Sequence, residues 1–316
     1  LRRFGAPVRF ACFLRGFRMV TISDARIDQL IAEDVPYFDL TSHALGLGDA
    51  PGRMDYFTRE DCVLAGTEVA VRIAAKLGCT VLEAQPSGQR LVAGQEFMAV
   101  RGSAAALHQM WKVCLNVFDH CSAVATKTRA MVDAVHAANP ACEVLTTRKS
   151  MPGVKDLLVD SCIAGGAFPH RLGLSETVLV FDHHLTFLGG FDAFVEQLPV
   201  IRQRCVEKKL FVEVDAEGAR RLACVNAESA RACAESGGAI PWVGVDGVQV
   251  DKLGADELSG LVKELRAIDP RMTIIAAGGV NPQNCAAYAA TGVDGIATTA
   301  PFTAKPIDMS VRMQAL

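Results

Sequence analysis

The sequence predicts an α/β protein whose C-terminal half consists of parallel strands joined by crossover helices. From Cys142 onwards, short apolar runs typical of strands alternate with longer amphipathic stretches typical of helices. The strand-like runs are CEVLTTRK, TVLVFDHH, LFVEVD, GVQVDK, MTIIAAGG and GVDGIATT. The helical stretches between them are 154–164, 191–209, 216–236, 256–267 and 282–291. This alternation fits a βα barrel and, almost as well, an open doubly wound sheet.

The N-terminal part predicts a smaller unit ahead of these strands. Ser23 or Asp24 can cap a helix that runs through about Glu33. Residues 51–110 then alternate short strands and turns, which is typical of a small α+β unit. Residues 107–138 lack proline and glycine and predict a long helix that leads into the second unit.

The first 18 residues, LRRFGAPVRFACFLRGFR, are basic and apolar, with no organised pattern. A targeting signal would fit this composition, but ordered pattern begins just after Met19. We therefore expect residues 1–18 to be a non-native or disordered leader and Met19 to be the natural start.

Composition and charge narrow the classes of partner and compartment. The net charge of −3 over 316 residues leaves no dominant basic face, which argues against nucleic acid as a partner. The 11 cysteines are scattered and form no CxxC pair, so they indicate reduced thiols, mostly buried, in a cytoplasmic protein. No run approaches the ~20 apolar residues of a membrane helix, so we expect no membrane span.

Polar or glycine clusters end each predicted strand of the second half. In a βα barrel these strand ends meet at one mouth, where such enzymes place their chemistry. Individually the residues have ordinary explanations, such as a solvated basic pair or an outward-facing carboxylate. Together they predict a site for a multi-anionic phosphorylated substrate held with a divalent ion. The residues are Arg148, Lys149, His170, Arg171, Glu213, Asp251, Gly278 and Gly279.

Three ordered motifs give the chain a family resemblance. TTRKSMPG (146–153), AGGAFPHRLGL (164–174) and LVFDHH (179–184) resemble the signature elements of the quinolinate phosphoribosyltransferase family, also called nicotinate-nucleotide pyrophosphorylases. Further similarity, from about residue 20 to the end, lies in LNVFDHCSAVATKT, VEVD, GVQVD, AGGV and TGVDGIA.

The resemblance implies a fold and an assembly. It implies an N-terminal α/β sandwich (19–126), an incomplete, open TIM-like α/β barrel that carries the active site (127–300), and a C-terminal segment returning to the N-terminal domain (301–316). It also implies a homodimer, or a higher homo-oligomer, in which one subunit completes the other's site.

The resemblance further implies roles for single residues. Glu213 and Asp251 would hold the ribose and Mg²⁺ of phosphoribosyl pyrophosphate (PRPP), and with Lys149 they form the expected catalytic set. Lys112 stands where the family has an arginine that reaches across the dimer; charge is kept but the bidentate fork is lost. The other expected substrate-binding residues are Arg148, His170, Arg171, Phe181, His183, His184, Gly278, Gly279 and Thr299.

Several positions depart from the family pattern, and Phe181 is the most informative. It replaces a lysine that helps to hold the carboxylates of quinolinate. A buried carboxylate left without its partner costs roughly 3–5 kcal/mol, so Phe181 favours an acceptor with less charge. Simple core packing of Phe181 is the competing explanation. The other departures are Val159, Pro169, His183, Ala277, Thr299 and Pro301.

A retained charged frame with altered acceptor contacts resembles the ModD branch of the family, which is linked to molybdenum use by neighbouring genes. We expect a phosphoribosyltransferase that moves phosphoribosyl from PRPP to a ring nitrogen of an aromatic, carboxylated acceptor other than quinolinate. The alternative is a non-catalytic accessory protein that binds molybdate or another oxyanion on the same fold. An ordinary quinolinate enzyme with unusual contacts is the third possibility.

Overall fold

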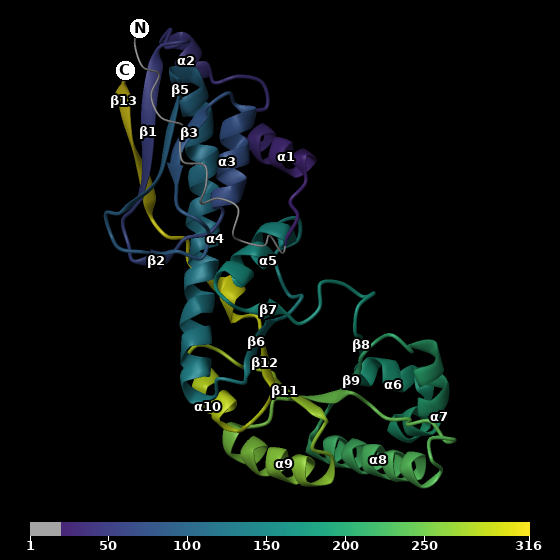
Figure 1. The fold of residues 1–316 in the computed structure, drawn as a ribbon. Coiled ribbons are helices and arrows are strands. Elements are labelled where there is room, and N and C mark those ends of the chain that lie inside the picture. The colour runs from purple at the N-terminus through teal and green to yellow at the C-terminus, as the bar shows by residue number, and fades with distance from the viewer. Residues whose placement is uncertain (1–19) are drawn as a thin grey trace, which may run out of the picture. The chain divides into compact units, whose positions relative to one another are not determined.

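The computed structural model describes residues 20–316, so the predicted leader 1–18 and Met19 lie outside the described residues. These residues form two compact units (Figure 1). The first comprises the chain up to Thr126 together with Gly153–Gly165 and Lys305–Leu316. The second comprises Lys127–Pro152 and Gly166–Ala304. The division falls within one long helix, α4 (Ala104–Ala138).

The first unit is built on a four-stranded antiparallel sheet in the order β13-β1-β5-β3. These strands are β1 (Pro51–Thr58), β3 (Thr80–Ala84), β5 (Glu96–Ser103) and the C-terminal β13 (Met309–Ala315). A short ribbon joins β2 (Cys62–Val63) to β4 (Arg90–Leu91). The helices are α1 (Asp24–Asp34), α2 (Leu40–Ala44), α3 (Thr67–Lys76), α5 (Lys155–Ala164) and the first part of α4.

Buried aromatic rings fill the core of this unit. Tyr56 of β1, Phe97 of β5 and Phe118 of α4 are all buried, and their ring centroids lie 4.9–6.2 Å apart. At the start of α1, the Ser23 side chain accepts a hydrogen bond from the Arg26 N–H, so the predicted cap is confirmed. The predicted long helix is also confirmed, and it begins three residues earlier than Leu107.

The second unit is built on a curled parallel sheet of seven strands in the order β7-β6-β12-β11-β10-β9-β8. Consecutive strands from β8 to β12 are neighbours, and β6 and β7 continue in the same direction. A doubly wound sheet would instead reverse its strand order at a switch point. The order therefore selects the barrel, and the unpaired edges of β7 and β8 leave it incomplete, as the family resemblance implied.

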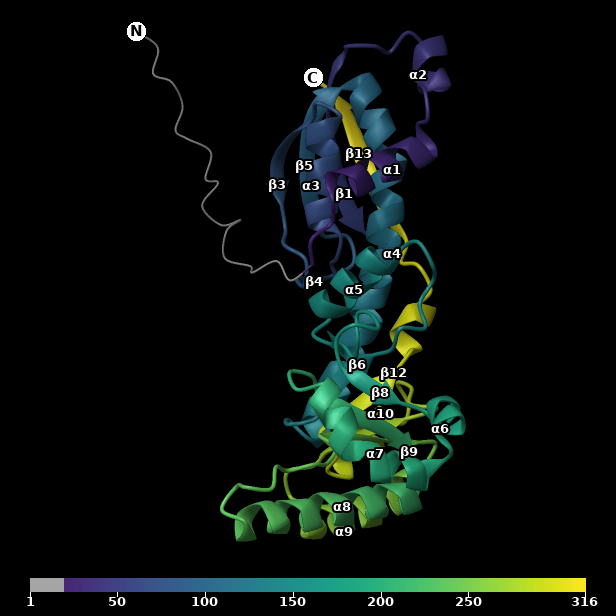
Figure 2. The same cartoon turned by 90° about the vertical axis from the view of Figure 1, so that its right-hand side faces the viewer.

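The strands and helices of this unit follow the predicted alternation. The strands are β6 (Glu143–Thr146), β7 (Phe168–Pro169), β8 (Val178–Val180), β9 (Leu210–Val214), β10 (Gly247–Asp251), β11 (Thr273–Ala277) and β12 (Gly295–Thr298). The helices are α6 (Asp182–Leu188), α7 (Phe191–Arg204), α8 (Ala216–Glu235), α9 (Ala255–Ile268), α10 (Cys285–Ala290) and the 3₁₀ turn η2 (Ala300–Thr303). α8 and α9 pack side by side (Figure 1, Figure 2).

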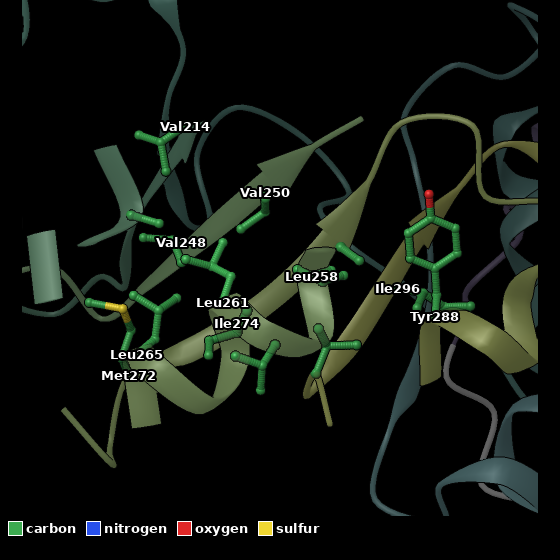
Figure 3. Packing of buried hydrophobic residues seen from close by; sticks show 14 of the residues in the cluster. Val214, Val248, Val250, Leu258, Leu261, Leu265, Met272, Ile274, Tyr288 and Ile296 are labelled. Carbon is green, nitrogen blue, oxygen red and sulfur yellow. The ribbon is translucent and has the colours of Figure 1, made fainter. Parts of the chain in front are cut away.

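The two faces of the curled sheet carry different clusters. On the outer face, valines and isoleucines of β10 and β11 meet leucines of α9, such as Leu258 and Leu261 (Figure 3). On the inner face a small cluster remains, made of Leu179, Phe211, Ile275, Ala277 and Ala297, with Leu145 and Phe181 packed against it. Residues two apart on a strand share a face, so Glu213 lies on the same inner face as Phe211.

Three sequence predictions need correction in this unit. The strand expected from TVLVFDHH ends at Val180, and the residues from Asp182 onwards form the first turn of α6. The helix expected over 282–291 begins only at Cys285, because Asn281 and Asn284 hydrogen-bond to the backbone of the preceding turn. The two-residue strand β7 was not predicted, since a proline ends it.

No helix in the described part of the chain is long and apolar enough to cross a membrane.

Candidate active site

An acidic group lies at the carboxyl ends of β9 and β10. Glu213 of β9 is in register with Gln249 of β10, whose side-chain amide donates a hydrogen bond to the Glu213 carboxylate. Asp251 ends β10 and also faces this region. Burial raises the pKa of Glu213, and the charges of Asp251 and Asp182 raise it further, whereas Gln249 and Lys149 lower it. The strand ends therefore bring three carboxylates and one lysine into electrostatic contact.

Arg148 and Lys149 follow β6 in an exposed turn. The Thr147 N–H donates to the Thr298 carbonyl of β12 at 3.0 Å, and the Thr147 hydroxyl accepts from the Lys149 N–H at 3.2 Å. These bonds tie the turn to the neighbouring strand, so both basic side chains start from a fixed backbone. Lys149 is close enough to Glu213 to favour its ionised form.

His170 and Arg171 follow β7, and Arg171 forms a cationic group with Arg148. The His170 N–H donates to the Thr146 carbonyl at 2.9 Å, while its buried side-chain Nε2 has no hydrogen-bond partner among the described residues. Burial, and then the charge of Arg171, lower the pKa of His170. Burial, and then the charge of Arg148, lower the pKa of Arg171. Cations held together in this way favour binding of an anion.

Phe181 continues the extended backbone of β8 by one residue, and its ring packs against the inner-face cluster. The Arg171 guanidinium carbon lies 5.9 Å from the centre of this ring. The His184 ring stacks on it with centroids 5.8 Å apart and an interplanar angle of 28°. The Phe181 N–H donates to His184 Nδ1 at 2.9 Å, so His184 caps α6. Phe181 is thus half-buried and lies beside a member of the cationic group, whereas His183 is exposed on α6.

Gly278 and Gly279 form the turn after β11, with φ angles of +82° and +75°. A Cβ on Gly278 would lie 2.5 Å from Asp251 Oδ1, so this position also needs glycine for space. Neither glycine N–H donates a hydrogen bond within the described residues, which leaves both free for an anion. The Thr298 hydroxyl donates to the Val280 carbonyl at 2.7 Å and fixes this turn to β12. Thr299 is half-buried at the start of η2.

Lys112 lies on the part of α4 that belongs to the first unit, where it is exposed. Its ammonium lies 6.0 Å from the centre of the Trp111 ring. Its expected reach across a dimer stays a prediction.

The carboxylates of Glu213 and Asp251 can be compared with the ligands that a magnesium ion uses. No group of three or more His, Cys, Asp or Glu side chains suited to a metal is present in residues 20–316. Mg²⁺ is commonly held by one or two carboxylates together with substrate phosphates. Glu213 and Asp251, on adjacent strands, can supply such a pair.

Three polar residues of this site were not assigned a role from the sequence. Gln249 is a polar residue in the otherwise apolar run GVQVD, two positions before Asp251, and that spacing places both on one face. Asp182 reaches Glu213 because the chain turns into α6 directly after Phe181. Thr298 is an ordinary strand residue in the sequence, and nothing there indicates that its hydroxyl bonds to the turn after β11.

Comparisons with known proteins agree with this architecture. Residues 39–122 match the N-terminal domain, and residues 124–312 the C-terminal domain, of the quinolinate phosphoribosyl transferase family. The chain is 36% identical over 268 residues to the provisionally named pyrophosphorylase ModD of Rhodobacter capsulatus, covering 85% of this chain and 96% of that protein. It is 30% identical over 296 residues to a protein of the same name from Escherichia coli O127:H6, covering 94% and 98%.

More distant relatives include the human nicotinate-nucleotide pyrophosphorylase (carboxylating), 29% identical over 292 residues, with 92% of this chain and 91% of that protein covered. The crystal structure of NadC from Streptococcus pyogenes shares the fold, with a TM-score of 0.79 at 22% identity over 93% of this chain and 98% of that chain. With both family domains matched in order, and the half-barrel and its strand-end residues in place, the chain belongs to the quinolinate phosphoribosyltransferase family.

Proposed function

We propose that this protein transfers the phosphoribosyl group of PRPP, bound with Mg²⁺, to a ring nitrogen of an aromatic acceptor. One observation carries the proposal. A group of carboxylates, the cationic residues Arg148, Lys149 and Arg171, and a glycine turn with free N–H groups all occupy the carboxyl ends of the strands of one half-barrel. In α/β barrels this end of the strands is where catalysis occurs.

Each group suits one part of the reaction. Displacing pyrophosphate from C1′ develops positive charge on the ribose ring, which the carboxylates of Glu213 and Asp251 can stabilise. Lys149 can stabilise the negative charge on the departing pyrophosphate. The bound Mg²⁺ would supply further charge to that leaving group. Because the acceptor nitrogen attacks C1′ directly, positioning and electrostatics suffice without a covalent enzyme intermediate.

The glycine turn suits the 5′-phosphate of PRPP. Gly278 and Gly279 present N–H groups with no protein acceptor, and successive N–H groups in such a turn make an anion-binding concavity. Gly278 also lies against Asp251, which would place the phosphate near the carboxylate that we propose for the ribose.

The acceptor we propose carries fewer carboxylates than quinolinate. Phe181 offers a flat apolar ring beside Arg171, and Arg148 is the second cation of that group. A planar ring can lie against Phe181 while one carboxylate meets the arginines. A second carboxylate against Phe181 would be desolvated without a partner, at a cost of several kcal/mol.

We further propose a cytoplasmic homodimer with a shared site, to which Lys112 contributes. All cysteines in the described residues are free thiols, which suits a reducing compartment.

Variants of the acidic group test the proposal. Glu213→Ala and Asp251→Ala should each lower pyrophosphate release from PRPP by about 100-fold or more, since each removes charge that acts in the transition state. Glu217→Ala, an exposed carboxylate on α8, is the matched control and should keep full activity. Full turnover in either site variant would refute the catalytic role proposed for that carboxylate, and a wild type without turnover or PRPP binding would refute the transferase.

An oxyanion-binding accessory role, for example for molybdate, is the second candidate. The free glycine N–H groups favour it, since a tetrahedral dianion can occupy a phosphate site. The three carboxylates of Glu213, Asp251 and Asp182 oppose it, because they repel a bare dianion but suit a sugar carrying Mg²⁺. Calorimetry that shows PRPP binding without molybdate binding would exclude this candidate.

A further inference from the structure

Three side chains stand in one row across the inner face of the half-barrel. Val180 of β8 is in register with Val212 of β9, so Phe181, whose backbone is still extended, comes level with Glu213. On the other side, Gln249 of β10 is in register with Glu213. The Glu213 carboxylate therefore has a phenyl ring on one side and an amide on the other.

Glu213 has few groups that can fix its carboxylate. Asp251 and Asp182 repel it, and Lys149 attracts it from an exposed turn. The phenyl ring of Phe181 has no donor for it and is engaged by Arg171 and His184. Gln249 Nε2 donates a hydrogen bond to the Glu213 carboxylate. Gln249 is itself only 7% exposed, so its amide is held in place by packing.

We propose that Gln249 is a positioning residue that aims the Glu213 carboxylate at the ribose of PRPP. This inference rests on the proposed function. A half-buried carboxylate beside two other carboxylates gains by turning toward solvent, and a hydrogen bond from a buried amide prevents that turn. A cation at position 181 could also hold the Glu213 carboxylate, from the side opposite Gln249, but phenylalanine cannot. The pocket therefore depends on Gln249.

Calorimetric titration of the full chain with PRPP and Mg²⁺ tests this without knowledge of the acceptor. Gln249→Met keeps the length of the side chain and removes the donor. It should weaken PRPP binding about tenfold, the size expected for one hydrogen bond to a charged group. Gln203→Met, at an exposed position on α7, is the matched control and should bind as the wild type does. Equal affinity in folded Gln249→Met and wild type would overturn the inference.

A double-mutant cycle separates positioning from packing. With Phe181→Lys in the background, the lysine can hold Glu213, so Gln249→Met should cost less than threefold. A purely packing role for Gln249 would give the same loss in both backgrounds, and that result would contradict the proposal.

Failure of the inference differs from failure of the proposed function. If the wild type binds no PRPP, the transferase fails, and the pair is then tested by urea unfolding of Gln249→Met, Glu213→Gln and the double variant. Non-additive midpoint shifts would support the hydrogen-bonded pair, and additive shifts would overturn it.

Discussion

At the scale of single residues, the proposed choice of acceptor depends on Phe181. It lies between the apolar inner-face cluster and the Arg171 guanidinium, and it is half-buried. Core packing and acceptor contact were alternatives from the sequence; the structure shows packing on the inner-face cluster and a contact with Arg171, and the acceptor contact stays a prediction. The contact with Arg171 could not be predicted, because it depends on how the chain after β7 approaches the end of β8.

Phe181→Lys should raise the use of quinolinate by about 10- to 100-fold in kcat/KM, because the ammonium gives a second carboxylate its partner. Steady-state pyrophosphate release with quinolinate measures this. Phe187→Lys is the matched control: Phe187 lies on the same helix, is 93% exposed, and should leave quinolinate use unchanged. An unchanged rate in Phe181→Lys would show that this ring does not set the acceptor.

At the scale of elements, the strand ends were predictable and the turns after them were not. The apolar runs predicted β9, β10, β11 and β12 correctly, because buried parallel strands consist of nearly continuous apolar residues. The strand predicted at β8 extended too far, because Phe181 and Asp182 continue its sequence pattern. In the structure the Phe181 N–H donates to the side chain of His184 in the next turn, so the strand ends there. Gln249 was overlooked for a related reason. Its contact with Glu213 depends on which strand lies beside β10, and the sequence alone does not show that.

The turn after β11 gives a test of backbone geometry. Gly278→Ala should lower stability by about 2 kcal/mol or more and abolish PRPP binding, since it adds a clash with Asp251 to the strain of a positive φ. Gly279→Ala has the same strain but open space and should cost about 1 kcal/mol. Urea unfolding compares the two, and equal costs would contradict the close approach of Gly278 to Asp251.

The contact between α4 and the C-terminal segment gives a test by pH. Burial raises the pKa of Asp119 to about 6, against a small opposing effect of the hydrogen bond from the Met309 N–H. Because its pKa is raised, Asp119 binds its proton more tightly in the folded state than in the unfolded state. Its contribution to the free energy of unfolding should therefore fall as pH rises from about 4 to 6. After discounting for solvent, Asp119→Asn should stabilise the protein by about 1 kcal/mol at pH 7 and flatten this dependence.

Thermal unfolding between pH 4 and pH 7 measures the effect of Asp119→Asn. Glu33→Gln, at an exposed position on α1, is the control and should keep the wild-type profile. A pH profile that Asp119→Asn leaves unchanged would show that this carboxyl does not titrate in that range.

At the scale of the whole molecule, we expect each active site to contain residues of two subunits. If Lys112 contributes to the partner's site, each site takes Lys112 from one subunit and Glu213 from the other. Lys112→Ala and Glu213→Ala then remove residues that different subunits supply. Mixing the two inactive variants under conditions of subunit exchange should restore about a quarter of wild-type activity, because half the dimers then hold one intact site of two. Exchange without recovery would place Lys112 outside the shared site.

The fold at this scale was predictable in class, and the choice between barrel and doubly wound sheet was not made by periodicity. Both have the same local alternation, and they differ only in which strands pair, which is a non-local property. The ordered motifs around Arg148, His170 and Asp182 implied the incomplete barrel, because they resemble motifs of a family with that fold.

The most direct test of the central claim is pyrophosphate release from PRPP with Mg²⁺ by the wild-type chain across a panel of acceptors. The panel contains quinolinate, nicotinate, other pyridine and imidazole acids, and neutral bases. We expect turnover with an acceptor that carries one carboxylate or none, and at least about tenfold less with quinolinate. Efficient turnover with quinolinate would contradict the altered acceptor, and absence of both turnover and PRPP binding would contradict the transferase itself.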